Sequence, residues 1–138
     1  ASKWTLAEKL PKDINVSSVM SEIKRYFGIR SLSKKLKSES ESGYIKNLYG
    51  RKIESSRSHV NHYLQSTGVD VSFKIFDQIL SEMNKADLEF TPLYVIHDAI
   101  VLDISPESEK IIRDISNRKF KVAGLDCYFP TKLDVIKE

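Results

Sequence analysis

Residues 94–103 constrain the fold of this chain more than any other stretch. They read Tyr-Val-Ile-His-Asp-Ala-Ile-Val-Leu-Asp, two apolar and β-prone runs on either side of a His-Asp pair. This pattern predicts a strand, a tight turn and a returning strand, with Asp98 at the bend. A carboxylate held there on rigid backbone suits coordination of a hard cation such as Mg²⁺.

The remaining pattern predicts an α+β fold. Apolar residues recur at three- and four-residue steps over 58–83, which predicts one long helix. A shorter helix is expected over 16–27, with Ser17-Ser18 as its cap and Gly28 as its stop. The polar stretch 31–42 is either a short surface helix or a connector.

Three further elements follow from turn and cap residues. Tyr49-Gly50-Arg51 lies between two β-prone runs and predicts a hairpin. Ser105-Pro106-Glu107 places a cap, a proline and an acid at the start of a helix that should run to about Arg118. Residues 120–129 are expected to form one strand, which Pro130 ends.

Composition limits the class of protein. The chain has 138 residues, of which 41% are apolar and 30% charged, enough for one globular core. We expect no membrane partner, because no apolar run could span a bilayer and no secretory leader is seen. A soluble protein with a cytoplasmic location is therefore expected, with an organelle matrix as the alternative. Cys127 is the only cysteine, which excludes an intrachain disulfide scaffold.

Charge is distributed unevenly along the chain. Residues 1–60 hold 13 Lys and Arg against 6 Asp and Glu, while residues 61–138 hold 9 against 13, so the halves are +7 and −4 and sum to +3. A basic first half suits contact with a phosphate backbone. Ordinary scatter of solvated charge is the alternative interpretation.

Three blocks in order resemble the C-terminal third of a family A DNA polymerase, the class of bacterial polymerase I and T7-like phage replicases. They are Gly43–Ile53, Asn61–Asp70 and Tyr94–Asp103, and the resemblance covers roughly 43–133. It implies a partial polymerase palm, in which an antiparallel hairpin bearing a His-Asp motif packs with a long helix. Residues 1–42 would then be a helical fingers-side remnant or docking region, and residues 43–138 the C-terminal palm segment.

The resemblance implies template-directed nucleotidyl transfer in the cytoplasm of a bacterial or phage-infected cell. A primer 3′-hydroxyl would attack the α-phosphate of a deoxynucleoside triphosphate, and two Mg²⁺ ions would assist. Asp98 would be the catalytic metal ligand. For an aspartate in a hairpin turn, the alternative role is local turn capping.

The resemblance also implies contacts with primer-template DNA. Asn61 and Gln65 lie four residues apart on one helical face and would donate hydrogen bonds into the minor groove. Such contacts check the shape of a base pair without reading its sequence. His97 would contact the phosphate or sugar at the end of the primer, and the alternative for a lone histidine in a hairpin is a structural role. The structural alternative is that the two amides cap or bridge neighbouring helices.

Basic residues of the first block would meet the DNA backbone. Arg51 has the fork geometry that suits phosphate, with Lys46 and Lys52 beside it. Asp70 matches the acid that closes the helix motif of the family and would have a structural role.

The chain departs from the family pattern in three ways. Ala99 stands where members usually have a glutamate, although related single-subunit RNA polymerases also lack that acid and remain active. A second metal-binding aspartate and a nucleotide-binding helix are not found. We therefore expect this chain to be inactive alone and to be completed by a second polypeptide or an upstream chain.

Three other interpretations remain open. The chain could be a catalytically silent DNA-binding relic or accessory protein, which Ala99 and the missing motifs favour. It could be the palm of a single-subunit RNA polymerase. It could also be an unrelated α+β domain that binds neither DNA nor a complementing chain.

Overall fold

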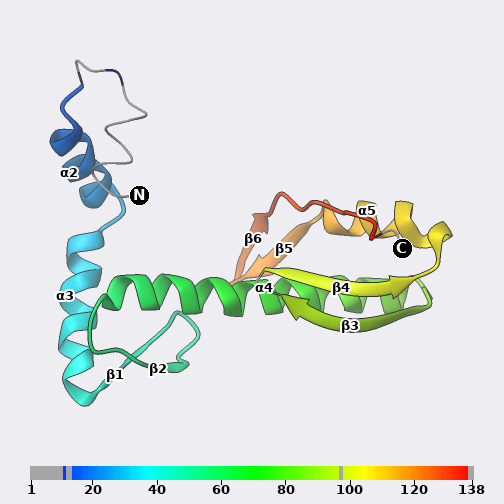
Figure 1. Ribbon diagram of the computed structural model, residues 1–138, viewed down its shortest axis with the longest axis horizontal. Coiled ribbons are helices and arrows are strands. Elements are labelled where there is room, and N and C mark those ends of the chain that lie inside the picture. The colour runs from blue at the N-terminus through cyan, green and yellow to red at the C-terminus, as the bar shows by residue number, and fades with distance from the viewer. Residues whose placement is uncertain (1–10, 12–13, 97, 137–138) are drawn as a thin grey trace. The chain divides into compact units, whose positions relative to one another are not determined.

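The computed structural model describes residues 11, 14–96 and 98–136, which form two compact units (Figure 1). The first unit ends at Ser66 and the second begins at Thr67. Helix α4 (His59–Lys85) begins in the first unit and continues into the second.

The first unit is built from helices and one hairpin. Asn15 caps α2, because its side-chain oxygen accepts hydrogen bonds from the backbone N–H groups of Ser17 and Ser18 at 3.0 and 3.2 Å. The cap is therefore Asn15 and not the two serines that the sequence predicted. The other elements of this unit are α2 (Val16–Tyr26), α3 (Ile29–Glu39), the 3₁₀ turn η1 (Ser40–Ser42), β1 (Tyr44–Lys46) and β2 (Lys52–Glu54).

The stretch 31–42, left open between helix and connector, is helical. Gly28 lies at φ 61°, a left-handed conformation that ends α2 and lets α3 begin at once. Leu36 of α3 and Ile45 of β1 are almost fully buried and form the apolar centre of this unit. The predicted hairpin is confirmed, with Ile45 paired to Ile53 in an antiparallel ladder.

The second unit packs two hairpins and a short helix on the remainder of α4. Figure 1 shows the β3–β4 hairpin extended along this part of α4. Ile75, Ile79 and Met83 of α4 lie in one buried cluster with residues of the later elements. These are β3 (Phe90–Ile96), β4 (Ala99–Ile104), the 3₁₀ turn η2 (Pro106–Ser108), α5 (Glu109–Ser116), β5 (Lys119–Val122) and β6 (Leu125–Tyr128).

The expectation of one strand over 120–129 was wrong. The segment is a hairpin, β5 paired antiparallel to β6, that turns at Ala123 and Gly124. Both turn residues have positive φ, 50° and 82°, which suits glycine and makes a tight reversal possible. The predicted α+β fold with antiparallel hairpins and a long helix is confirmed.

Within the described ranges, no helix is long and apolar enough to cross a bilayer.

The buried cluster predicts a stability effect at Met83. Its side chain is fully buried, so Met83→Ala should lower the free energy of unfolding by about 2–5 kcal/mol through lost transfer energy and a residual cavity. Urea unfolding followed by circular dichroism measures this change. Ser81→Ala, at an exposed position of the same helix, is the matched control and should change stability by less than about 0.5 kcal/mol.

Candidate nucleic-acid interface

The turn that presents Arg51 is organised by Asn47. The buried Asn47 side chain accepts hydrogen bonds from the backbone N–H groups of Tyr49 and Arg51, both at 3.0 Å. Its own backbone N–H donates to the Arg51 carbonyl at 3.0 Å, and Gly50 takes the positive φ of 79° that closes the turn. Sequence reasoning missed Asn47, although an asparagine that opens a turn before Gly-Arg is a recognisable signal.

Arg51 lies against the helix that carries the predicted amides. Its guanidinium donates to the backbone carbonyl of Ser66 in α4 at 3.1 Å, while much of the side chain stays exposed. The contact ties the turn to α4 within the first unit. Arg51, which the sequence predicts to contact DNA, therefore makes a structural contact with α4.

The two lysines flank the same hairpin. Lys46 and Lys52 are cross-strand partners, and both are exposed. The Lys52 ammonium lies 4.7 Å from the centre of the Tyr44 ring, a cation–π contact. The backbone N–H of Lys46 donates to the Glu39 carboxylate at 3.2 Å.

Asn61 and Gln65 lie one turn apart on α4, and both are exposed. A four-residue step places them on one helical face, where amide donors are available to a ligand. A shallow depression at the start of α4 is lined by Asn61 and its neighbours Ser33, Ser58, His59, Val60 and Leu64. Asp70 lies further along α4 in the second unit and is half-buried.

Asp98 is exposed in the turn of the β3–β4 hairpin, directly before β4. Ile96 and Ala99 are cross-strand partners, so only residues 97 and 98 connect the two strands. The predicted position of Asp98 at a tight bend is thereby confirmed. His97 lies outside the described residues.

The described residues do not by themselves form a site for two Mg²⁺ ions. Among them, no three His, Cys, Asp or Glu side chains come together in a way that could hold a metal ion. Mg²⁺ is bound through several oxygen ligands, and Asp98 offers one carboxylate. Asp103 pairs with Thr91 at the far end of the hairpin, so it does not join Asp98 as a second metal ligand.

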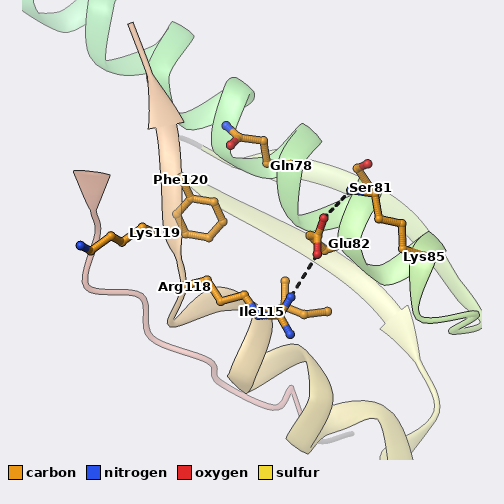
Figure 2. Close-up of a pocket in the computed structure, with 8 residues that line it drawn as sticks. All are labelled: Gln78, Ser81, Glu82, Lys85, Ile115, Arg118, Lys119 and Phe120. Atoms are coloured by element: carbon orange, nitrogen blue, oxygen red, sulfur yellow. Dashed lines mark hydrogen bonds and ion pairs between the residues drawn. The ribbon is translucent and has the colours of Figure 1, made fainter. Parts of the chain in front are cut away.

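A pocket of about 310 Å³ lies in the second unit between α4, α5 and β5 (Figure 2). At its wall, Gln78 bonds the backbone of Lys121 twice: its side-chain oxygen accepts from the N–H at 2.8 Å, and its amide donates to the carbonyl at 3.0 Å. Gln78 thus pairs with β5 as a neighbouring strand would. The partners lie 43 positions apart in the sequence, so no local sequence signal indicated this contact.

The charges in this pocket are paired with one another. Figure 2 shows the Glu82 carboxylate between Lys85 and Arg118. Its oxygens lie 2.6 Å from the Lys85 ammonium and 3.0 Å from the Arg118 guanidinium. The hydrogen bond from Lys85, followed by the positive charges of Lys85 and Arg118, lowers the pKa of Glu82 from its ordinary value. The arrangement joins α4 to the end of α5, and we interpret it as structural.

Comparison with known proteins supports a polymerase-like fold. The chain is similar to the POL domain of Pol1 from M. smegmatis, solved in complex with DNA primer-template and dNTP, with a TM-score of 0.52 and 17% sequence identity. The match covers 84% of this chain and 24% of that chain, so this chain spans about a quarter of the structure it resembles. No protein-family model and no curated protein sequence matches the chain.

The Asn47 turn predicts a stability effect. Asn47→Ala leaves the N–H groups of Tyr49 and Arg51 without their acceptor, which should cost about 1–3 kcal/mol. Chemical unfolding of the variant measures the loss. Asn84→Ala, at an exposed asparagine of α4, is the matched control, and an equal effect of the two substitutions would contradict the role of Asn47.

The ion pairs of Glu82 predict a pH dependence. Because the folded state lowers the Glu82 pKa, its contribution to stability is present above the unfolded value and is lost as pH falls through the folded value. The melting temperature of Glu82→Gln should therefore fall less than that of the parent chain between neutral and acidic pH. Glu89→Gln, which changes an exposed carboxylate, should keep the parent slope.

Proposed function

We propose that this chain is the C-terminal palm segment of a family A DNA polymerase, active in DNA replication or repair synthesis as part of a larger assembly. The observation that carries the proposal is the fold similarity to the POL domain over 84% of the chain. The order of the Gly-Arg, Asn-Gln and His-Asp blocks along the sequence supports it independently.

An exposed apolar surface supports the need for further polymerase structure. The pairing of β3 with β4 shifts between Pro92 and Tyr94, where Leu93 forms a bulge. Beyond the bulge, Tyr94 pairs with Val101 and Ile96 with Ala99, so these four side chains share one face. Tyr94 and Ile96 are about half exposed, at 53% and 51%.

Such a surface is unusual in a protein that works alone. Each large apolar side chain left in water forgoes about 1.5–3 kcal/mol of burial energy, and contiguous apolar patches typically mark interfaces. We propose that the missing palm elements cover the apolar face of the β3–β4 hairpin. They would come from an upstream chain or from a second polypeptide, and would supply the other metal-binding aspartate and the nucleotide-binding helix.

In the complete enzyme, we propose for these residues the roles that the resemblance implies. Asn61 and Gln65 would donate hydrogen bonds to the minor groove of the primer-template, since both are exposed on one face of α4. Arg51, Lys46 and Lys52 would neutralise backbone phosphates. His97 would contact the primer end, and Asp70 would keep its structural role.

Asp98 would supply one ligand to the Mg²⁺ ions, which stabilise the charge that develops as the primer hydroxyl attacks the α-phosphate and pyrophosphate leaves. The exposed turn gives its carboxylate access to such a ligand. Because Ala99 offers no oxygen ligand from its side chain, the remaining ligands must come from the completing elements.

Asp98 is testable in the native assembly. Asp98→Asn keeps the size of the side chain and removes its charge, so primer extension with Mg²⁺ should fall by at least about a hundredfold while primer-template affinity changes little. Asp103→Asn is the matched control on the same hairpin and should retain activity. Equal activity of Asp98→Asn and the parent assembly would refute the metal role.

DNA contact by α4 is testable with this chain alone. Gln65→Ala should weaken binding of a fluorescent primer-template duplex by up to about tenfold, the size of one or two lost hydrogen bonds, and equally for duplexes of different sequence. Fluorescence anisotropy at fixed salt measures the affinity. Gln78→Ala changes the other α4 glutamine, which lies in the second unit, and should leave the affinity unchanged.

The catalytically silent relic remains a second candidate, because Ala99 and the lack of a metal cluster among the described residues favour it. It predicts DNA binding by the chain with no primer extension in any native fraction.

A further inference from the structure

Two histidines and two serines meet where the first turn of α4 packs on the hairpin and η1. The Ser55 hydroxyl oxygen lies 2.7 Å from Nδ1 of His59 and 3.0 Å from Nδ1 of His62. On its other side, Nε2 of His59 lies 3.2 Å from the Ser40 hydroxyl oxygen. All four residues belong to the first unit, and Ser55 is only 4% exposed.

The distances indicate where the hydrogen atoms in this cluster lie. The Ser40 hydroxyl has two acceptors in reach, the Lys37 carbonyl at 2.8 Å and Nε2 of His59 at 3.2 Å, and the shorter distance assigns its hydrogen to Lys37, so that its oxygen accepts from His59. His59 must therefore carry a hydrogen on Nε2. In a neutral imidazole the other nitrogen is then an acceptor, so Nδ1 of His59 receives a hydrogen bond.

Ser55 supplies that hydrogen bond. Its oxygen is 2.7 Å from Nδ1 of His59, against 3.0 Å from Nδ1 of His62 and 3.5 Å from the Arg57 carbonyl, which is at the limit of hydrogen bonding. With the Ser55 hydrogen used, the contact to His62 requires His62 to donate from Nδ1. The result is a directed chain from His62 through Ser55, His59 and Ser40 to the Lys37 carbonyl.

This hydrogen-bonded chain fixes the start of α4, where the backbone is strained. Ser58, the residue before α4, has a φ of 54°, which costs a non-glycine residue roughly 1 kcal/mol or more and persists only where its surroundings enforce it. His59 and His62 lie just beyond this residue, and Asn61 lies between them in the same turn. The orientation of that turn is therefore set by the hydrogen-bonded chain.

We propose that His59 and His62 are positioning residues, which act through Ser55 and Ser40 to hold Asn61 ready for contact with nucleic acid. His59 is the Nε2–H tautomer and His62 the Nδ1–H tautomer. The role of Asn61 rests on the proposed function, whereas the tautomers rest on the hydrogen-bond geometry alone. Neither histidine contacts the ligand in this account.

The tautomers are read directly from nitrogen NMR of the full, ¹⁵N-labelled chain near pH 8. Long-range ¹H–¹⁵N spectra separate protonated from unprotonated ring nitrogens, and His59→Gln and His62→Asn assign the signals. We expect the hydrogen of His59 on Nε2 and that of His62 on Nδ1. A His62 hydrogen on Nε2, or averaging of either ring between tautomers, would overturn the hydrogen-bonded chain.

Coupling to Asn61 is tested by a double-mutant cycle in primer-template affinity, measured by anisotropy. Asn61→Ala and Ser55→Ala should each weaken binding about five- to tenfold, and the double variant should lose no more than Asn61→Ala alone. If the double variant instead loses affinity by the product of the two single losses, Ser55 acts independently of Asn61, and the positioning role is overturned.

A conservative exchange separates positioning from general stability. His62→Asn keeps a side-chain N–H donor near the position of Nδ1, whereas His62→Leu removes it. We expect His62→Asn to retain the parent affinity and His62→Leu to match Ser55→Ala, although both remove the imidazole. Equal losses in both variants would contradict the role. An absence of DNA binding by the parent chain, with the expected tautomers present, would refute the proposed function and leave the hydrogen-bonded chain standing.

Discussion

Burial of one side of α4 is the interaction on which the second unit depends. Ile75, Ile79 and Met83 enter one apolar cluster with residues from α5 and both of the later hairpins. Gln78, on the same helix, bonds the backbone of β5, and Glu82 forms ion pairs with Lys85 and Arg118. The helix thus serves as the support on which two separate two-stranded sheets are placed.

The packing of the hairpins on α4 also explains why the second unit leaves apolar surface exposed. A two-stranded hairpin that packs one face on a helix has no further strand to cover its other face. In the β3–β4 hairpin that face is apolar from the bulge at Leu93 to the turn that holds Asp98, where it consists of Tyr94, Ile96, Ala99 and Val101. The same hairpin therefore presents the proposed metal ligand and the surface that we expect further polymerase structure to cover.

The sequence predicted the elements whose signals are local. Helical spacing located α4, and the alternation of apolar runs with a His-Asp pair located the β3–β4 turn. The β5–β6 turn was missed because Ala123-Gly124 lies within an otherwise β-prone run, and the cap of α2 was assigned to the wrong residue. The first error merged two strands into one, and the second concerns a single residue at a helix boundary, where local signals compete.

The candidate site was predictable only in part. The exposed positions of Asn61, Gln65 and Asp98 agree with a binding role, and that role stays a prediction. The contact of Arg51 with Ser66 and the cluster around Ser55 join residues 15 and up to 19 positions apart. Such contacts depend on how the hairpin packs on α4, which spacing along the chain does not encode.

The most direct test of this account is purification of the protein from its source under native conditions, with intact-mass analysis of every co-eluting chain and primer extension on the same fraction. The account predicts that these residues are recovered with a second polypeptide, or within a longer one, in a fraction that extends primers with Mg²⁺. Recovery of a lone, inactive chain of 138 residues would contradict it.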